Sequence, residues 1–224
     1  MTRFDTTHWS VVLGAAEGDD AAREAFCQTY GRVIRSYLCA RWRLPFEHEN
    51  VDEGIQEVFL ECFKEKGALT RADPERPFRA FLYGVTSNTA VTLERRWRRR
   101  DRDHGVSGFD PDRVERDEAT LSQVFDREWA RMVGQEARAL FARRSAEGDA
   151  SGRRAKCLEL RYQRGLPPRE IASQLDVKVE RIYEMLHQAK ADYRAALLEV
   201  MAQHHPGATK ADLERICGEL AGRL

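Results

Sequence analysis

A short arginine-rich stretch, "ERRWRRRDRDHG" (residues 94–105), carries the clearest chemistry in the sequence. It holds six arginines around one tryptophan, Trp97. Guanidinium groups bind phosphates and release the counterions condensed on a nucleic acid, so such binding weakens as salt rises. An indole ring stacks on an unpaired base, which contributes about 1–3 kcal/mol per base. The stretch therefore predicts contact with a nucleic acid. The alternative is that Trp97 packs in a domain core while the arginines complement a helix C-terminus.

A second group of charged residues lies upstream and is acidic. Asp52, Glu53, Glu57 and Glu61 fall near one face of an expected helix, where carboxylates could hold a magnesium ion for a nuclease. We find no histidine, lysine or glycine-rich loop placed to complete such a site, so we do not predict an enzyme. The formal net charge of the chain is zero. Its acidic and basic residues are nevertheless segregated, which indicates two partners of opposite charge.

Composition predicts a folded, cytoplasmic protein. The chain has 224 residues, of which 42% are hydrophobic and 33% charged. No apolar run approaches the roughly 20 residues of a membrane-spanning helix, and the N-terminus lacks the pattern of a signal peptide, so we expect no membrane insertion. The five cysteines include no CxxC pair, which favours reduced thiols over disulfides or a zinc site. His204, His205 and Cys217 are the nearest approach to a metal set, and we predict neither a metal nor a cofactor.

The hydrophobic pattern predicts an all-α fold of two small helical domains joined by a linker. Helices are expected at residues 7–16, 20–40 and 51–66, with Asp19 or Asp20 as an N-cap. The third has one apolar stripe, formed by Ile55, Val58, Phe59, Cys62 and Phe63. The expected division is a first domain at 1–104, a linker with its own helix at 105–150, a second domain at 151–203, and a helical extension at 204–224.

The most diagnostic pattern lies in the second domain, in "CLELRYQRGLPPREIASQLDVKVERIYEMLHQAKADYRAAL". Gly165 ends one helix, Pro167 and Pro168 begin the next, and "LDVK" forms a tight turn before the third. This is the spacing of a helix-turn-helix, whose second helix enters the DNA major groove. The alternative is a helical hairpin with a solvated outer face. The residues expected to face DNA are Lys178, Arg181, Tyr183, Glu184, His187, Gln188 and Lys190, and the family resemblance described next implies that this DNA is the minus-thirty-five promoter element.

Taken in order along the chain, these segments resemble the small bacterial RNA polymerase sigma factors of the extracytoplasmic-function (ECF) group. "NVDEGIQEVFLECFKEKG" is similar to the helix that such factors lay against the clamp helices of the polymerase largest subunit. "FRAFLYGVTSNTAVTLERRWRRR" is similar to the segment that recognises and melts the minus-ten promoter element. The resemblance implies a sigma factor that directs the polymerase core to promoter DNA. Many relatives are also held by an anti-sigma protein.

The resemblance also implies roles for particular residues. Those that match the polymerase-binding helix are Asp52, Glu53, Gln56, Glu57 and Phe59, although Phe59 has a core position as its alternative. Residues 67–77 match the loop that captures a flipped base of the non-template strand. Those that match the minus-ten segment are Arg79, Tyr83, Ser87, Asn88, Arg95, Arg96, Trp97, Arg98 and Arg99.

Departures from the family pattern are also visible. Gly54 stands where the family usually has a leucine, which we expect to loosen the helix by up to about 1 kcal/mol. Tyr183, Glu184 and Met185 replace basic or small polar residues on the recognition helix. The extension from residue 206 has no counterpart, and we expect it to pack on the second domain or to bind a regulator. A stand-alone helix-turn-helix regulator of transcription remains the alternative function.

Overall fold

The chain folds as helices alone in the parts that the structure describes. The computed structural model describes residues 8–104, 110–205 and 207–221, and these residues contain no strand. The predicted all-α class is thus confirmed. The chain divides into two compact units: unit 1 runs up to Met132 and resumes at Gln203, and unit 2 comprises Val133–Ala202.

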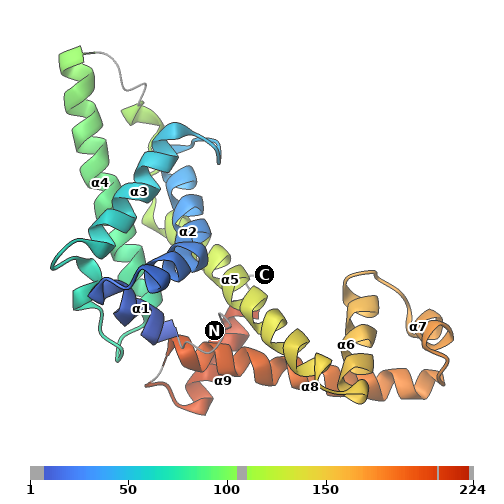
Figure 1. Cartoon of the computed structure of the whole chain (residues 1–224). Coiled ribbons are helices and arrows are strands. Elements are labelled where there is room, and N and C mark those ends of the chain that lie inside the picture. The colour runs from blue at the N-terminus through green and yellow to red at the C-terminus, as the bar shows by residue number, and fades with distance from the viewer. Residues whose placement is uncertain (1–7, 105–109, 206, 222–224) are drawn as a thin grey trace. The chain divides into compact units, whose positions relative to one another are not determined.

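Unit 1 is a bundle built around α2, α3 and α4 (Figure 1). Asp19 caps α2 by accepting a hydrogen bond from the backbone N–H of Ala22 at 2.9 Å, which confirms one of the two predicted caps. The first residues of the predicted linker at 105–150, namely 105–109, lie outside the described residues. The elements of this unit are α1 (His8–Glu17), α2 (Asp20–Trp42), α3 (Glu49–Phe63), η1 (Ala68–Arg71), α4 (Phe78–His104), η2 (Pro111–Arg113), the first half of α5 (Glu118–Ala146) and α9 (Lys210–Ala221).

An aromatic core holds unit 1 together, and it includes residues that we expected in a linker. Trp129 of α5 stacks on Tyr30 of α2 at a centroid distance of 5.6 Å. Phe125, one turn earlier, packs edge-on against Tyr83 of α4. Both α5 side chains are buried, as is Val114. The first half of the expected linker is therefore part of the first unit, because its apolar stripe is wide enough to complete the bundle.

The C-terminal extension also belongs to unit 1, which corrects the expectation that it packs on the second domain. The ring of His204 lies 3.6 Å from the ring of His8, and edge-on to Trp129 at 5.3 Å. Thr209 and Asp212 then form the predicted capping box at the start of α9, with the hydroxyl of Thr209 accepting from the Asp212 N–H at 3.3 Å and the carboxylate accepting from the Thr209 N–H at the same distance.

A buried ion pair links α2 to α4 in unit 1. The guanidinium of Arg41 donates to both carboxylate oxygens of Glu94, at 2.5 and 3.3 Å, and the indole N–H of Trp42 donates to the same carboxylate at 3.0 Å. Arg41 and Glu94 are both buried. Burial lowers the pKa of Arg41, but the hydrogen bonds and charge interactions with Glu94 and Tyr37 together outweigh it and raise the pKa above its usual value. The guanidinium of Arg41 is therefore held in the core by its partners.

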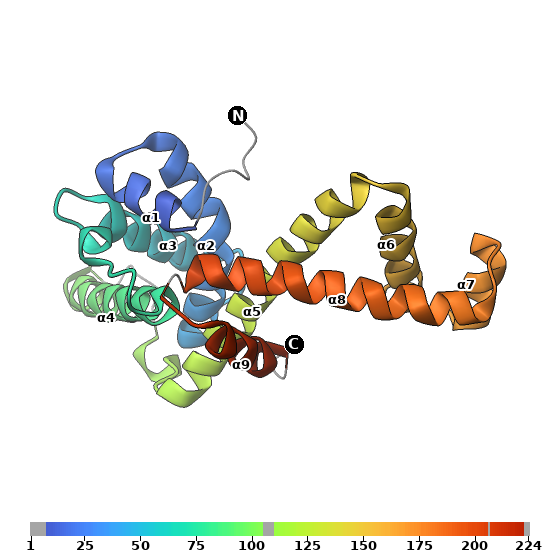
Figure 2. The ribbon, with the colours of Figure 1, turned by 90° about the horizontal axis from the view of Figure 1, so that it is seen from below.

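Unit 2 contains the predicted three-helix arrangement (Figure 2). Its helices are the second half of α5, α6 (Asp149–Tyr162), α7 (Pro168–Leu175) and most of α8 (Val179–His204). Asp176 ends α7 in the left-handed conformation, with a φ of 51°, and the N–H of Val177 bonds back to the carbonyl of Ala172 at 3.0 Å. The buried residues of one core cluster are Cys157, Leu160, Ile171, Ala172, Ile182, Met185 and Leu186, and those of a second are Phe141, Ala189 and Ala196.

Candidate nucleic-acid interface

The helix that carries the arginine block, α4, has two covered sides. It packs against α3 on one side, and side chains of α5 contact it on another. A helix between two neighbours keeps only a narrow strip for solvent, so its polar residues divide between internal contacts and the surface. This division decides the role of each residue that the sequence predicted to face DNA.

Trp97 lies in the core of unit 1 and not on its surface. Its side chain is 1% exposed, and its indole packs edge-on against Trp42 at 4.8 Å. The indole N–H donates to the carboxylate of Glu53 at 3.1 Å. A ring held in this way cannot stack on a base. The prediction that Trp97 binds minus-ten DNA is therefore corrected, and the core alternative is the one that the structure shows.

Arg79 and Tyr83 face α5. The guanidinium of Arg79 donates to the hydroxyl of Ser122 at 2.9 Å and forms an ion pair with Asp126. The hydroxyl of Tyr83 donates to the carboxylate of Glu118 at 2.5 Å, and burial together with this bond raises the pKa of Tyr83. Both residues hold α4 to α5, so neither lies on the open strip of α4 that we expected to face the strand.

The open strip of α4 consists of the remaining predicted residues. Asn88, Arg95 and Arg99 are exposed, one helical turn or two apart, and Ser87 and Arg98 are half-buried beside them. Arg96 is exposed as well, but its guanidinium donates to Glu57 of α3 at 2.7 Å. The strip therefore presents one amide and the guanidinium groups of Arg95 and Arg99, which form no ion pair with another side chain that the structure describes.

The acidic helix α3 uses most of its carboxylates within unit 1. Asp52 accepts from Arg35 at 2.6 Å, and Glu61 accepts from Lys64 at 2.6 Å. Glu53 and Glu57 accept from Trp97 and Arg96 of α4. The four carboxylates that could have held a magnesium ion thus have four different partners along the helix.

The other two predicted polymerase-binding residues differ in exposure. Gln56 is exposed. Phe59 is half-buried, with its ring edge-on to Phe26 at 6.3 Å and parallel to Phe63 at 5.9 Å. Phe59 therefore lies at the edge of the core, which agrees with the core position given above as the alternative to polymerase binding.

Gly54 has a packing reason that the sequence did not reveal. A Cβ atom built there would lie 2.5 Å from the indole of Trp42 and 2.9 Å from Leu38. Real Cβ atoms do not approach so closely, so a leucine at this position requires α2 and α3 to separate. The glycine that seemed to loosen α3 is what lets Trp42 fill the interface.

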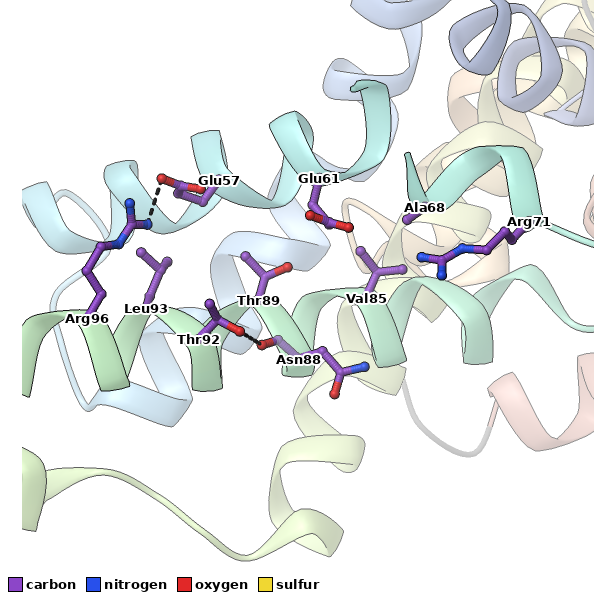
Figure 3. A pocket seen from close by; sticks show the side chains of 10 residues that line it. All are labelled: Glu57, Glu61, Ala68, Arg71, Val85, Asn88, Thr89, Thr92, Leu93 and Arg96. Atoms are coloured by element: carbon purple, nitrogen blue, oxygen red, sulfur yellow. Dashed lines mark hydrogen bonds and ion pairs between the residues drawn. The ribbon is translucent and has the colours of Figure 1, made fainter. Parts of the chain in front are cut away.

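A pocket opens between α3, η1 and α4, and its side chains are mostly polar (Figure 3). Its volume is about 260 Å³. Figure 3 shows the Arg96–Glu57 ion pair at one end and the guanidinium of Arg71, from η1, at the other, with Asn88 on the α4 side. The lining residues are Glu57, Glu61, Ala68, Arg71, Val85, Asn88, Thr89, Thr92, Leu93 and Arg96.

This pocket contains hydrogen-bond donors and acceptors in a small volume. Guanidinium and amide groups donate, and carboxylate and hydroxyl oxygens accept, so the pocket suits the edge of a planar polar group such as a base. Sequence reasoning named the loop 67–77 as a whole but missed Arg71, Thr89 and Thr92 individually. The spacing of Asn88, Thr92 and Arg96, four residues apart on one helix, is the signal that would have found Thr92.

The predicted face of α8 in unit 2 is exposed throughout. All seven residues expected there have exposed side chains: Lys178, Arg181, Tyr183, Glu184, His187, Gln188 and Lys190. Tyr183 is 60% exposed, which is high for so large a ring. The ammonium of Lys190 lies 5.3 Å from the ring centre of Tyr162, and Arg181 forms an ion pair with Glu184 at 2.6 Å. Met185, which we read as a replacement on the outer face, is 5% exposed and belongs to the core.

Comparison with known proteins gives no family for this chain. No family model matches it, and no curated protein matches it. None of the helices in the described parts of the chain combines the length and apolar character needed to span a bilayer. The functional argument therefore rests on the geometry of the two units.

Proposed function

We propose that this protein is a sigma-type initiation factor, which binds the RNA polymerase core in the cytoplasm and directs it to promoter DNA. The observation that carries the proposal is the pairing of two DNA-suited surfaces in one chain. In unit 2, α7 and α8 are joined by a tight turn and the predicted face of α8 is exposed throughout. In unit 1, the open strip of α4 lies beside the polar pocket. A duplex-binding regulator has no need for the second surface.

Each surface suits one form of the promoter. The exposed face of α8 offers arginine, lysine, glutamine and glutamate side chains, which read base edges in a major groove. The strip of Asn88, Arg95 and Arg99 offers a phosphate track, and the adjacent pocket takes the edge of an unpaired base. The exposed residue Gln56 on α3 remains the strongest candidate for contact with the polymerase clamp.

A stand-alone regulator is the second candidate, and one observation favours it. Four of the five residues expected to bind polymerase are engaged inside unit 1: Asp52 with Arg35, Glu53 with Trp97, Glu57 with Arg96, and Phe59 with its aromatic neighbours. A regulator would bind duplex DNA at physiological salt without polymerase, which separates the two functions.

The test is co-purification of the chain with bacterial core polymerase, followed by transcription from genomic fragments. We expect a stable complex and starts at specific sites. Arg95→Ala with Arg99→Ala should then reduce the slope of log K against log salt for promoter complexes by about 2, one per lost phosphate contact. Arg143→Ala, elsewhere on the surface, is the matched control. Absence of core binding, together with tight binding to duplex DNA, would establish the regulator instead.

A further inference from the structure

A second cavity lies in unit 2, between the first turns of α6 and the start of α8. Its volume is about 270 Å³. Only two of its lining residues, Arg181 and Gln188, belong to the predicted recognition face. The full lining consists of Asp149, Ala150, Arg153, Arg154, Val177, Arg181, Met185 and Gln188.

Three arginines, Arg153, Arg154 and Arg181, line this cavity, and Asp149 is the one acidic residue among its lining residues. They come from two helices that the fold brings together, so their convergence is not a property of one charged helix face. A guanidinium carries five N–H donors in a fixed planar fork, and several forks from different directions match the oxygens of a tetrahedral anion. The chemistry of the lining is therefore that of an anion site.

Ion pairs position two of these arginines without using all their donors. The Nε of Arg154 donates to Asp192 at 2.9 Å, its Nη2 forms an ion pair with the same carboxylate oxygen at 2.9 Å, and its side chain is 24% exposed. Arg181 donates from Nη1 to Glu184 at 2.6 Å. Each retains further N–H groups for a ligand. Arg153 is exposed, and the described residues include no hydrogen-bond or ion-pair partner for it.

The rest of the lining increases the effect of these charges. Met185 is buried, and with Val177 it gives the cavity an apolar wall. Charge interactions strengthen where apolar groups displace water. Gln188 adds an amide donor on the α8 side.

We propose that this cavity binds a phosphate group. The phosphate comes either from the backbone of bound DNA or from a small free phosphate compound. The DNA source rests on the proposed function, since it places a backbone phosphate beside the recognition helix. The free source does not depend on that function.

The test uses the full chain without polymerase. Duplex DNA binding is measured by fluorescence anisotropy between 50 and 200 mM salt, and binding of inorganic phosphate and pyrophosphate by calorimetry. The variants are Arg153→Gln, which removes one guanidinium, and Ala150→Glu, which adds a carboxylate while every arginine stays in place. Arg164→Gln is the control, because Arg164 is an exposed arginine of the same unit that does not line the cavity. Thermal melting verifies that each variant is folded.

The outcomes separate the two sources. If the phosphate is that of DNA, Arg153→Gln reduces the salt slope of DNA binding by about 1, and Ala150→Glu weakens DNA binding further. The control variant Arg164→Gln shows neither change. If the ligand is small, inorganic phosphate or pyrophosphate binds the wild-type chain and loses at least tenfold in affinity in both cavity variants. If neither the slope nor phosphate binding differs from the control, the proposal is wrong. Loss of core-polymerase binding would overturn the initiation-factor proposal alone and would leave this result standing.

Discussion

The two helices expected to contact DNA, α4 in unit 1 and α8 in unit 2, use their charged residues in different ways. On α4, Arg79, Tyr83, Arg96 and Trp97 all have partners inside unit 1. On α8, every residue of the predicted face is exposed. On a helix with more than one covered side, a polar or aromatic residue is therefore a candidate for binding only where its side chain lies on the exposed strip, as Asn88, Arg95 and Arg99 do on α4.

The number of packing neighbours explains the difference. The first turns of α8 pack on α6 and α7 through one apolar stripe that includes Ile182 and Leu186. The opposite face of that segment has no neighbour in unit 2. In contrast, α4 is covered by both α3 and α5, and polar side chains complete those two interfaces. We therefore expect that removing a buried charged partner in unit 1 lowers the stability of the protein, whereas removing a charged residue from the exposed face of α8 changes the stability little.

The largest effect is expected at the buried pair of unit 1. Glu94→Ala leaves the guanidinium of Arg41 buried without its carboxylate, which should lower the free energy of unfolding by about 3–5 kcal/mol. Urea unfolding followed by circular dichroism measures this change. Glu184→Ala is the counterpart in unit 2, where both partners of the pair are more than half exposed, and it should cost no more than about 1 kcal/mol. Equal costs for the two variants would contradict the comparison.

A pair of glycines gives the next largest effect. Gly54→Ala places a Cβ against the indole of Trp42 in the closed interface of α2 and α3, and should destabilise unit 1 by about 1–3 kcal/mol. Gly84→Ala lies on α4 where a Cβ meets nothing within 4 Å, and should stabilise the protein by up to about 1 kcal/mol through helix propensity. Thermal melting of both variants checks the opposite signs. A stabilised Gly54→Ala would show that the interface has room that the structure does not contain.

The same contrast explains how much of the molecule the sequence could predict. The helix starts at Asp19 and Thr209 were predictable, because capping depends on residues three positions apart. The turn before α8 and the core under it were predictable as well, since one stripe on a helix with one covered side is read directly from its period. These features are local, and local rules describe them.

Long-range packing is what the sequence concealed. The indole of Trp97 meets Glu53, which is 44 residues earlier, and Arg79 meets Ser122, which is 43 residues later. Spacing on α4 alone does not say that α5 returns to cover it. For the same reason the apolar stripe of α5 was visible, yet its place in the first unit was not. The pocket at Arg71 also needs η1 and α4 together, so only the folded chain defines it.

The smallest expected effect concerns the ion pair between Glu57 of α3 and Arg96 of α4. Glu57→Gln releases Arg96, and because both partners are partly exposed the stability should change by less than about 1 kcal/mol. Binding should respond more clearly than stability, since a freed guanidinium becomes available to a phosphate. We expect the salt slope of binding by the chain alone to duplex DNA to steepen by up to about 1. Glu159→Gln is the control, because Glu159 pairs with Lys156 and Arg164 and belongs neither to the open strip of α4 nor to the predicted face of α8. If the slope is unchanged while stability falls by several kcal/mol, Arg96 is a structural residue like Arg79, and it does not add to the open strip of Asn88, Arg95 and Arg99.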